Sequence, residues 1–274
     1  MEHHRASVNG IDLHYVESGR GPLVVLLHGF PEFWYSWRNQ IPALIDAGFR
    51  VVAADLRGYN ESSKPPHVSD YRLVTVANDI AALIEEELDE PAVLVGHDWG
   101  GLVSWLLAMM RPELLRKLVV LNMPHPVPLV REIHRSTRQK LRLAYQLFFR
   151  LPMIPELLMP LILPTVLRRA GHFKREEIAE YQNVWRDFET RRGMAHYYRA
   201  GQRYRGELRQ HIVPIELPTL LIWGERDPVF TRETTENFDE SVPNLRIARI
   251  AGAGHFVQTD APDQVSELLV DCAR

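Results

Sequence analysis

The stretch VLVGHDWGG, residues 93–101, places an aspartate at the point where one apolar run gives way to the next. The spacing Gly-x-Asp-x-Gly is that of a nucleophile elbow, a sharp strand-to-helix turn whose central residue is usually serine. Here the central residue is Asp98. Such a turn packs its backbone tightly against neighbouring chain, and Gly96, Gly100 and Gly101 supply the room that this needs.

A carboxylate at the centre of an elbow predicts a specific chemistry. Asp98 is ionised at neutral pH and needs no base in order to act as a nucleophile. It would attack a saturated carbon, such as that of an epoxide or an alkyl halide, and form an ester that water then hydrolyses. The alternative is an aspartate that only caps the following helix, since aspartate is a common N-cap residue.

The motif HGFPE, residues 28–32, follows directly after an apolar run and predicts a tight turn beside the elbow. This turn would direct the Phe30 N–H toward Asp98, where it would join the Trp99 N–H as an oxyanion hole. The hole would serve the second step, when an oxyanion develops on the ester carbonyl. The bond between Phe30 and Pro31 is a candidate cis peptide. An ordinary strand-to-loop turn is the alternative.

A base for the water is expected near the end of the chain. His255, in AGAGHFVQTDAP, lies in a Gly-rich loop after the last apolar run, and histidine is the natural base near neutral pH. We expect His28 and His97 to shape their turns. Further histidines are expected to be structural or exposed: His3, His4, His134, His172, His196 and His211.

An acid that orients the histidine is expected in LLIWGERDPVF, and Asp227 is the candidate. The order Asp98, Asp227, His255 is then nucleophile, acid, histidine. The acid would hold the histidine tautomer and stabilise the imidazolium. Glu225 is the rival, but it lies closer to the end of the apolar run. Asn122 occupies another place where the acid could stand and carries no charge, which favours Asp227.

Short apolar runs predict the buried parallel strands that would position these residues, at 23–29, 50–55, 92–97, 117–122, 219–224 and 245–252. Helical patterns at 74–88 and 102–110 lie between them. The start, SVNGIDLHYVESG, predicts an antiparallel hairpin at the sheet edge because Asn-Gly separates two alternating runs. This alternation predicts an α/β fold, with an open, mostly parallel sheet that is covered on both faces by helices.

Residues 124–214 contain no strand-like run and are rich in helical patterns and aromatic residues. We therefore expect a helical lid inserted between two strands of one core, which would be formed by residues 1–123 and 215–274. A separate helical domain is the alternative. The most apolar segment, residues 157–167, is interrupted by prolines and is far shorter than the roughly 20 residues that cross a bilayer.

Composition narrows the classes of function. The 274 residues are 46% hydrophobic, enough for one sizeable core, and the formal net charge of −3 gives no reason to expect nucleic acid or a membrane as a partner. The single cysteine excludes an internal disulfide and a cysteine-based metal site. The first ten residues lack the pattern of a signal peptide, so we expect a cytoplasmic protein.

Together these motifs resemble those of the α/β-hydrolase superfamily and, within it, of the soluble epoxide hydrolases. The similarity is carried by HGFPEFWYSWRNQIPAL, DLRGYNESSKP, GHDWGG and the closing GHF. It covers nearly the whole chain and is weakest in the lid. The resemblance implies an α/β-hydrolase fold with a helical cap, and the addition of water to an epoxide to give a vicinal diol by the aspartyl-ester route, without a cofactor or a metal.

The resemblance also implies two lid tyrosines that hydrogen-bond the epoxide oxygen. Tyr145, in LAYQLFFRLP, and Tyr198, in MAHYYRAG, match those positions, with the adjacent Tyr197 as the alternative to the second. Because an alkoxide is a poor leaving group, a phenol with a pKa of about 10 that donates a proton would assist ring opening. Simple packing within the lid is the other explanation for these tyrosines.

Other functions fit parts of the pattern. A haloalkane dehalogenase shares the fold and nucleophile, but its frequent halide-binding asparagine is replaced by Phe30. A haloacetate dehalogenase would want an arginine beside Asp98, where Trp, Gly and Gly follow. A non-catalytic ligand receptor would not need the complete triad. We expect a small apolar epoxide and water as partners, since the lid is rich in apolar residues. The oligomeric state stays open, with a homodimer as one option.

Overall fold

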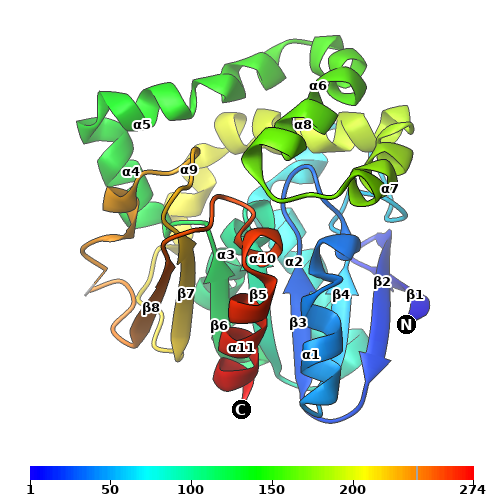
Figure 1. Ribbon diagram of the computed structural model, residues 1–274, viewed down its shortest axis with the longest axis vertical. Coiled ribbons are helices and arrows are strands. Elements are labelled where there is room, and N and C mark those ends of the chain that lie inside the picture. Colours follow the sequence, from blue (N-terminus) through cyan, green and yellow to red (C-terminus); the bar gives the residue numbers. More distant parts are fainter. Residues whose placement is uncertain (239) are drawn as a thin grey trace.

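The apolar runs form one eight-stranded sheet in the order β1-β2-β4-β3-β5-β6-β7-β8 (Figure 1). The computed structural model describes residues 1–238 and 240–274. The strands within these residues are β1 (Glu2–Val8), β2 (Ile11–Gly19), β3 (Leu23–Leu27), β4 (Arg50–Ala54), β5 (Ala92–His97), β6 (Leu115–Leu121), β7 (Thr219–Gly224) and β8 (Leu245–Ile250). All six predicted strands are confirmed, with ends that agree to within two residues, although the last, β8, is only partly buried.

Strands β3 to β8 are parallel to one another, so their carboxyl ends share one edge of the sheet. The predicted edge hairpin is also confirmed, because β1 and β2 pair antiparallel and β2 pairs antiparallel with β4. Asn9 and Gly10 both have positive φ angles, 47° and 75°, as a two-residue hairpin turn with the twist of the strands requires.

Helices cover both faces of the sheet (Figure 1). On one face α1 (Gln40–Asp46) packs against α11 (Pro262–Ala273), and on the other α2 (Leu73–Ala82) packs against α3 (Trp99–Met110). Two separate apolar clusters, one on each face, bury the alternate side chains of the strands. The remaining helical segments around the core are η1 (Trp34–Trp37), η2 (Val68–Tyr71), η3 (Leu83–Leu88), η4 (Pro112–Leu114), η7 (Arg232–Thr235) and α10 (Val257–Asp260).

Between β6 and β7 the chain forms helices that lie across the carboxyl edge of the sheet, at the top of Figure 1. Residues 122–218, all of which the structure describes, contain no strand. We call this part the helical insertion (residues 126–211). Its elements are α4 (Pro126–Arg135), α5 (Thr137–Arg142), η5 (Ala144–Arg150), α6 (Ile154–Ala170), α7 (Arg175–Trp185), α8 (Phe188–Arg203), α9 (Arg205–Leu208) and η6 (Arg209–His211).

The long helix α6 differs from what its sequence suggests. We expected its prolines to interrupt the segment, yet Pro160 and Pro164 both lie inside one continuous helix. Each proline removes one backbone hydrogen bond, which normally kinks or ends a helix. The buried side of α6, which includes Met159 and Leu163, packs onto the rest of the insertion and compensates for this loss. Among the described residues, no helix is both long and apolar enough to cross a lipid bilayer.

Candidate active site

Asp98 occupies a strained turn between β5 and α3. Its φ and ψ angles are 49° and −119°, a conformation that non-glycine residues rarely adopt and that is found at functional turns. Two close contacts explain the glycines around it. A Cβ atom on Gly96 would lie 2.4 Å from the Gly100 carbonyl oxygen, and one on Gly100 would lie 2.4 Å from the Leu27 carbonyl oxygen. The predicted elbow is therefore present.

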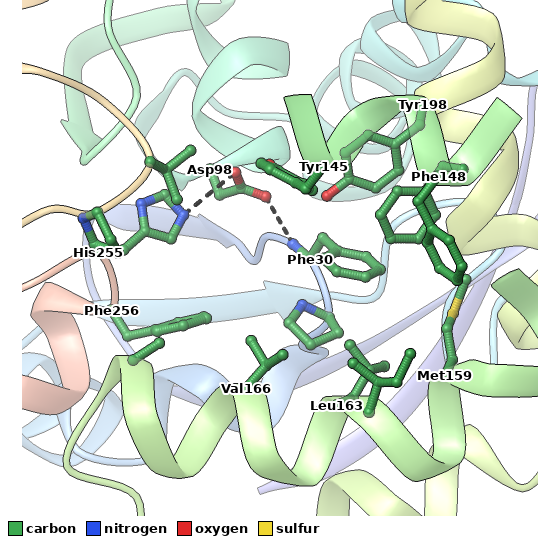
Figure 2. Close-up of a pocket in the computed structure, with 16 residues that line it drawn as sticks. Phe30, Asp98, Tyr145, Phe148, Met159, Leu163, Val166, Tyr198, His255 and Phe256 are labelled. Atoms are coloured by element: carbon green, nitrogen blue, oxygen red, sulfur yellow. Dashed lines mark hydrogen bonds and ion pairs between the residues drawn. The ribbon is translucent and has the colours of Figure 1, made fainter. Parts of the chain in front are cut away.

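The Asp98 side chain faces the HGFPE turn and His255. Its Oδ1 accepts a hydrogen bond from the Phe30 N–H at 2.8 Å, and its Oδ2 lies 3.5 Å from Nε2 of His255 (Figure 2). Within the described part of the chain it makes no capping bond to α3, so capping does not explain the aspartate. The Phe30–Pro31 peptide bond is cis, as predicted. Of the two expected backbone donors, the described structure has a bond to Asp98 from Phe30 and none from Trp99.

His255 lies between two carboxylates. Its Nδ1 is 2.9 Å from Oδ2 of Asp227, while its Nε2 faces Asp98. Both acids and the imidazole are buried, with at most 7% of each residue exposed. Glu225, the rival acid, instead pairs with Arg232 at 3.6 Å. The structure therefore brings together Asp98, His255 and Asp227, in the arrangement that the sequence predicted.

Backbone and amide groups hold the Asp227 carboxylate in place. Its Oδ1 accepts hydrogen bonds from the N–H groups of Val229 at 2.6 Å and Phe230 at 3.0 Å. Its Oδ2, the atom that meets His255, also accepts one from Nδ2 of Asn122 at 2.7 Å. This contact was not predicted from the sequence, in which Asn122 was considered only for its lack of charge. The signal was its position, because Asn122 directly follows β6, and β6 lies beside β7, from which the Asp227 loop departs.

The electrostatics favour a charged pair. Burial opposes the charged imidazolium, but the carboxylates of Asp227 and Asp98 outweigh it and raise the pKa of His255 to about 10. Burial also opposes the Asp98 carboxylate, but its contacts with His255 and the Phe30 N–H outweigh that effect and lower the pKa of Asp98. At neutral pH the resting site therefore holds an ionised Asp98 beside an imidazolium.

Asp98 and His255 open onto a cavity of about 410 Å³ between the sheet and the helical insertion (Figure 2). The wall is mostly apolar. Its residues include Phe30, Phe148, Phe149, Met159, Leu163, Val166 and Phe256. A cavity of this size suits a small apolar molecule, and its few polar groups would fix the orientation of that molecule.

Two tyrosines of the insertion line the same cavity as Asp98. Tyr145 comes from η5 and Tyr198 from α8, and their ring centroids are 6.0 Å apart. Tyr198 stacks on Phe149 at 4.1 Å, and Figure 2 shows its hydroxyl directed toward the side of the pocket that holds Asp98. Tyr197 is directed elsewhere, since its hydroxyl donates to the Arg57 carbonyl at 2.9 Å. Of the two adjacent tyrosines, Tyr198 is therefore the one in the pocket.

The two phenols keep their protons at neutral pH. Burial of the hydroxyl groups raises the pKa of both Tyr145 and Tyr198, and the negative charge of Asp98 raises it further. Each phenol therefore carries a proton that it can donate in a hydrogen bond.

A second buried polar group, which was not predicted from the sequence, lies behind the site. The Glu32 carboxylate, at the end of HGFPE, lies 3.0 Å from Nδ1 of His97 and accepts hydrogen bonds from Gln258 at 3.1 Å and from the Tyr181 hydroxyl at 3.3 Å. His97 in turn donates from Nε2 to the His255 carbonyl at 2.9 Å. These bonds connect the elbow, the histidine loop and α7, and so fix His255 relative to Asp98.

The other expected histidines lie outside the pocket wall. His28 shapes its turn as predicted, because its Nε2 accepts from the Leu56 N–H at 3.0 Å. Among the described residues, His3, His14 and Glu61 form one group that could hold a metal ion. His3 Nδ1 and His14 Nε2 lie 3.0 Å apart, as in a hydrogen bond, and Arg5 donates to Glu61 at 2.7 Å. The atoms that would bind a metal are therefore already paired.

The parallel sheet, the elbow and the buried acid–histidine pair at its carboxyl edge define an α/β hydrolase. Comparison with known proteins agrees, since the family model described as alpha/beta hydrolase fold matches residues 22–262. The AB hydrolase superfamily protein YfhM of Bacillus subtilis is 38% identical and covers 97% of this chain and 95% of its own. Human epoxide hydrolase 4 is 37% identical and covers 97% of this chain and 76% of its own.

Among solved structures, an epoxide hydrolase from Bacillus megaterium in complex with an inhibitor is similar over 98% of this chain and 99% of its own, with a TM-score of 0.88 and 31% identity. Epoxide hydrolase A from Mycobacterium thermoresistibile is similar with a TM-score of 0.85 and 30% identity, over 98% of this chain and 97% of its own. The chain belongs to the α/β hydrolase fold family and, within it, to the epoxide hydrolases.

Proposed function

We propose that this protein adds water to an apolar epoxide and releases a vicinal diol, through an ester formed on Asp98. One observation carries the proposal. The carboxylate of Asp98 faces an apolar cavity beside His255, and the phenols of Tyr145 and Tyr198 line the same cavity. The family relationship to named epoxide hydrolases supports the same reaction.

In the first step a carboxylate oxygen of Asp98 attacks one epoxide carbon from the side opposite to the ring oxygen. The carbon–oxygen bond of the ring breaks, and its electron pair goes to the departing oxygen. Tyr145 and Tyr198 donate hydrogen bonds to this oxygen and stabilise the negative charge that develops on it. The raised pKa of both phenols supports this assignment, because it keeps their protons in place at neutral pH.

Ester formation changes the state of His255. The ester carries no charge, so His255 loses one of the two carboxylates that raise its pKa. The imidazolium proton passes to the oxygen of the opened ring, which becomes an alcohol, and His255 is left as a neutral imidazole. Neutral His255, oriented by Asp227, then takes a proton from water as the water adds to the ester carbonyl. The Phe30 and Trp99 N–H groups would stabilise the oxyanion. Its collapse breaks the bond between the carbonyl carbon and the diol oxygen, which takes the proton of the new carboxyl group, so that the diol leaves and Asp98 is again ionised beside the imidazolium.

We propose that the helical insertion acts as a lid in this reaction. It supplies both phenols and most of the apolar wall of the cavity. A lid that excludes bulk water strengthens the electrostatic interactions within the site. The lid would correspond to residues 124–214, between two parts of the core.

Product analysis tests the proposed reaction directly. The protein is incubated in separate samples with styrene oxide, with 1-bromobutane and with bromoacetate, and both diol and bromide are measured. We expect diol from the epoxide, and we expect bromide release no higher than that measured with the variant Asp98→Asn. Bromide release without diol would make the protein a haloalkane dehalogenase, and release of halide from a haloacetate alone would make it a haloacetate dehalogenase. Binding of styrene oxide without any product would make it a ligand receptor.

A further inference from the structure

The outer surface of the helical insertion is unusually apolar. Of the fifteen large apolar side chains that are exposed among the described residues, eleven lie between residues 141 and 166, and eight of these eleven do not line the cavity. Leu161 is 74% exposed, Leu141 71% and Leu157 59%. We call this surface, formed by α5, η5 and α6, the apolar face (residues 141–166). Contiguous apolar surface of this kind is uncommon on a protein surrounded only by water and marks a site of interaction.

Helix α6 is apolar on both of its sides. Its inner side, which includes Met159 and Leu163, packs onto the insertion and lines the cavity. Its outer side carries Leu157, Leu158 and Leu161, at spacings that put them on one face of a helix. In Figure 1, α6 lies at the end of the molecule farthest from the carboxyl terminus, with nothing above it. The outer side therefore lacks the packing partner that an apolar helix surface normally has.

The segment of the chain that contains this face carries an excess of positive charge. Residues 131–175 include ten Lys or Arg and two acidic residues, whereas the whole chain has 32 Lys or Arg and 35 Asp or Glu. Eight of the ten bases are exposed, and in the described part of the chain none of these eight forms an ion pair with a carboxylate. Of the two acids, Glu156 is buried and paired with Arg199 at 2.6 Å.

The bases at the end of α6 continue the outer apolar stripe. Arg168 lies seven residues after Leu161, which places both on the same line along the helix, and Arg169 is the next residue. Arg150 is the last residue of η5 and precedes the exposed residues before α6. An apolar strip bordered by bases is the pattern of a helix that lies in the interface of an anionic bilayer.

We propose that the apolar face binds peripherally to the surface of an anionic lipid bilayer, with α6 lying along the interface. A second copy of the chain is a poorer occupant, because a symmetric contact would bring two strongly positive surfaces together. The net charge of −3 led us to expect no membrane partner, but it is a sum over the whole chain and does not show the local excess of positive charge in residues 131–175.

Vesicle flotation tests the proposal without any catalysis, so its result is independent of the proposed reaction. The protein is mixed with vesicles of phosphatidylcholine alone or with 30% phosphatidylglycerol added, in about 0.1 M and about 0.5 M salt. We expect binding to the anionic vesicles that weakens several-fold at the higher salt, where the screening length falls well below 10 Å. Binding to the uncharged vesicles should be much weaker.

Three variants separate the two parts of the surface. Leu157→Glu with Leu161→Glu should weaken binding at least about tenfold, since two apolar contacts are replaced by charges. Arg168→Glu with Arg169→Glu should weaken it at least about twentyfold, because each base near an anionic surface contributes roughly a fivefold factor. The matched control is Val213→Glu, at an exposed apolar residue outside the face, and it should bind as the parent protein does.

Each variant is first shown to keep the circular dichroism spectrum and unfolding midpoint of the parent protein. The proposal is overturned if the parent does not bind anionic vesicles, or if the leucine and arginine variants bind as the control does. It is also overturned if light scattering shows a dimer that Leu157→Glu with Leu161→Glu converts to a monomer, with no vesicle binding by the parent. In that case the face is a subunit interface.

Discussion

Replacing Asp98 by asparagine should lower the pKa of His255 by two to three units. Their nearest atoms are 3.5 Å apart, and two opposite charges at that distance attract by about 4–5 kcal/mol at an effective dielectric constant of about 20. One pKa unit corresponds to about 1.4 kcal/mol, so this attraction equals about three units. Because both charges are spread over several atoms, we expect a somewhat smaller fall, of about two to three units.

The magnitude matters because asparagine has the same charge as the proposed ester. The pKa of His255 is about 10 in the resting site, where two carboxylates face the imidazole. Without the charge of Asp98 it should lie at about 7–8, where a histidine can act as a base at neutral pH. The proposed mechanism needs this change between its two steps.

Imidazole resonances followed by NMR in protein labelled with ¹⁵N-histidine measure this pKa in the parent and in Asp98→Asn. The control is Glu225→Gln, which removes a carboxylate from the same loop as Asp227 but one that faces Arg232, and it should leave the pKa of His255 unchanged. An equal pKa in the parent and in Asp98→Asn would refute the electrostatic account. So would a parent pKa near 6.5, the ordinary value for histidine.

Three further outcomes are expected. His255→Gln should form the ester but fail to hydrolyse it, so intact-mass measurement after mixing with styrene oxide should find protein heavier by one substrate; unmodified protein would count against the ester. Tyr145→Phe or Tyr198→Phe alone should slow ester formation in rapid-quench experiments by about 10–100-fold, since a hydrogen bond to a charged group contributes about 1.5–3 kcal/mol. Both changes together should nearly abolish ester formation. Ring opening at the parent rate by the double variant would show that the phenols are not involved. Because the folded-state pKa of His255 is raised from 6.5 to about 10, its contribution to stability is complete below pH 6.5 and is lost as the pH rises toward 10. Urea unfolding should accordingly show that the parent loses more stability over this range than His255→Gln, by up to about 1.4 kcal/mol per pH unit, and parallel pH profiles would contradict it.

The strands and the elbow could be predicted from sequence because their signals are local. Strands buried on both faces are continuous apolar runs, and the close approach of backbone at Gly96 and Gly100 leaves a fixed spacing around Asp98. The positions of Asp227 and His255 followed from their places after successive strands, since parallel strands end at one edge of the sheet.

What could not be predicted depends on contacts between distant parts of the chain. Glu32 and Gln258 are hydrogen-bonded across 226 residues, and no local pattern marks them as partners. Asn122 holds Asp227 from a different strand, although its sequence position indicated only a missing charge. Helix α6 forms despite Pro160 and Pro164 because tertiary packing outweighs the local preference.

The exposure of the apolar face could not be predicted from the sequence either. The composition of residues 157–167 would equally suit a buried helix, and a sequence does not say which side of such a helix finds a partner. The structure leaves Leu157 and Leu161 exposed beside Arg168, and this arrangement gives the segment its proposed contact with a bilayer.

The central claim is that Asp98 is covalently bound to the substrate before water enters the reaction. A single turnover in H₂¹⁸O, with protein in excess over styrene oxide, tests it most directly, followed by mass analysis of both the diol and the peptide that contains Asp98. The account predicts ¹⁸O in the carboxylate of Asp98 and an unlabelled diol, because water adds to the ester carbonyl and the original carboxylate oxygen leaves with the product. Label in the diol and none in the peptide would contradict it.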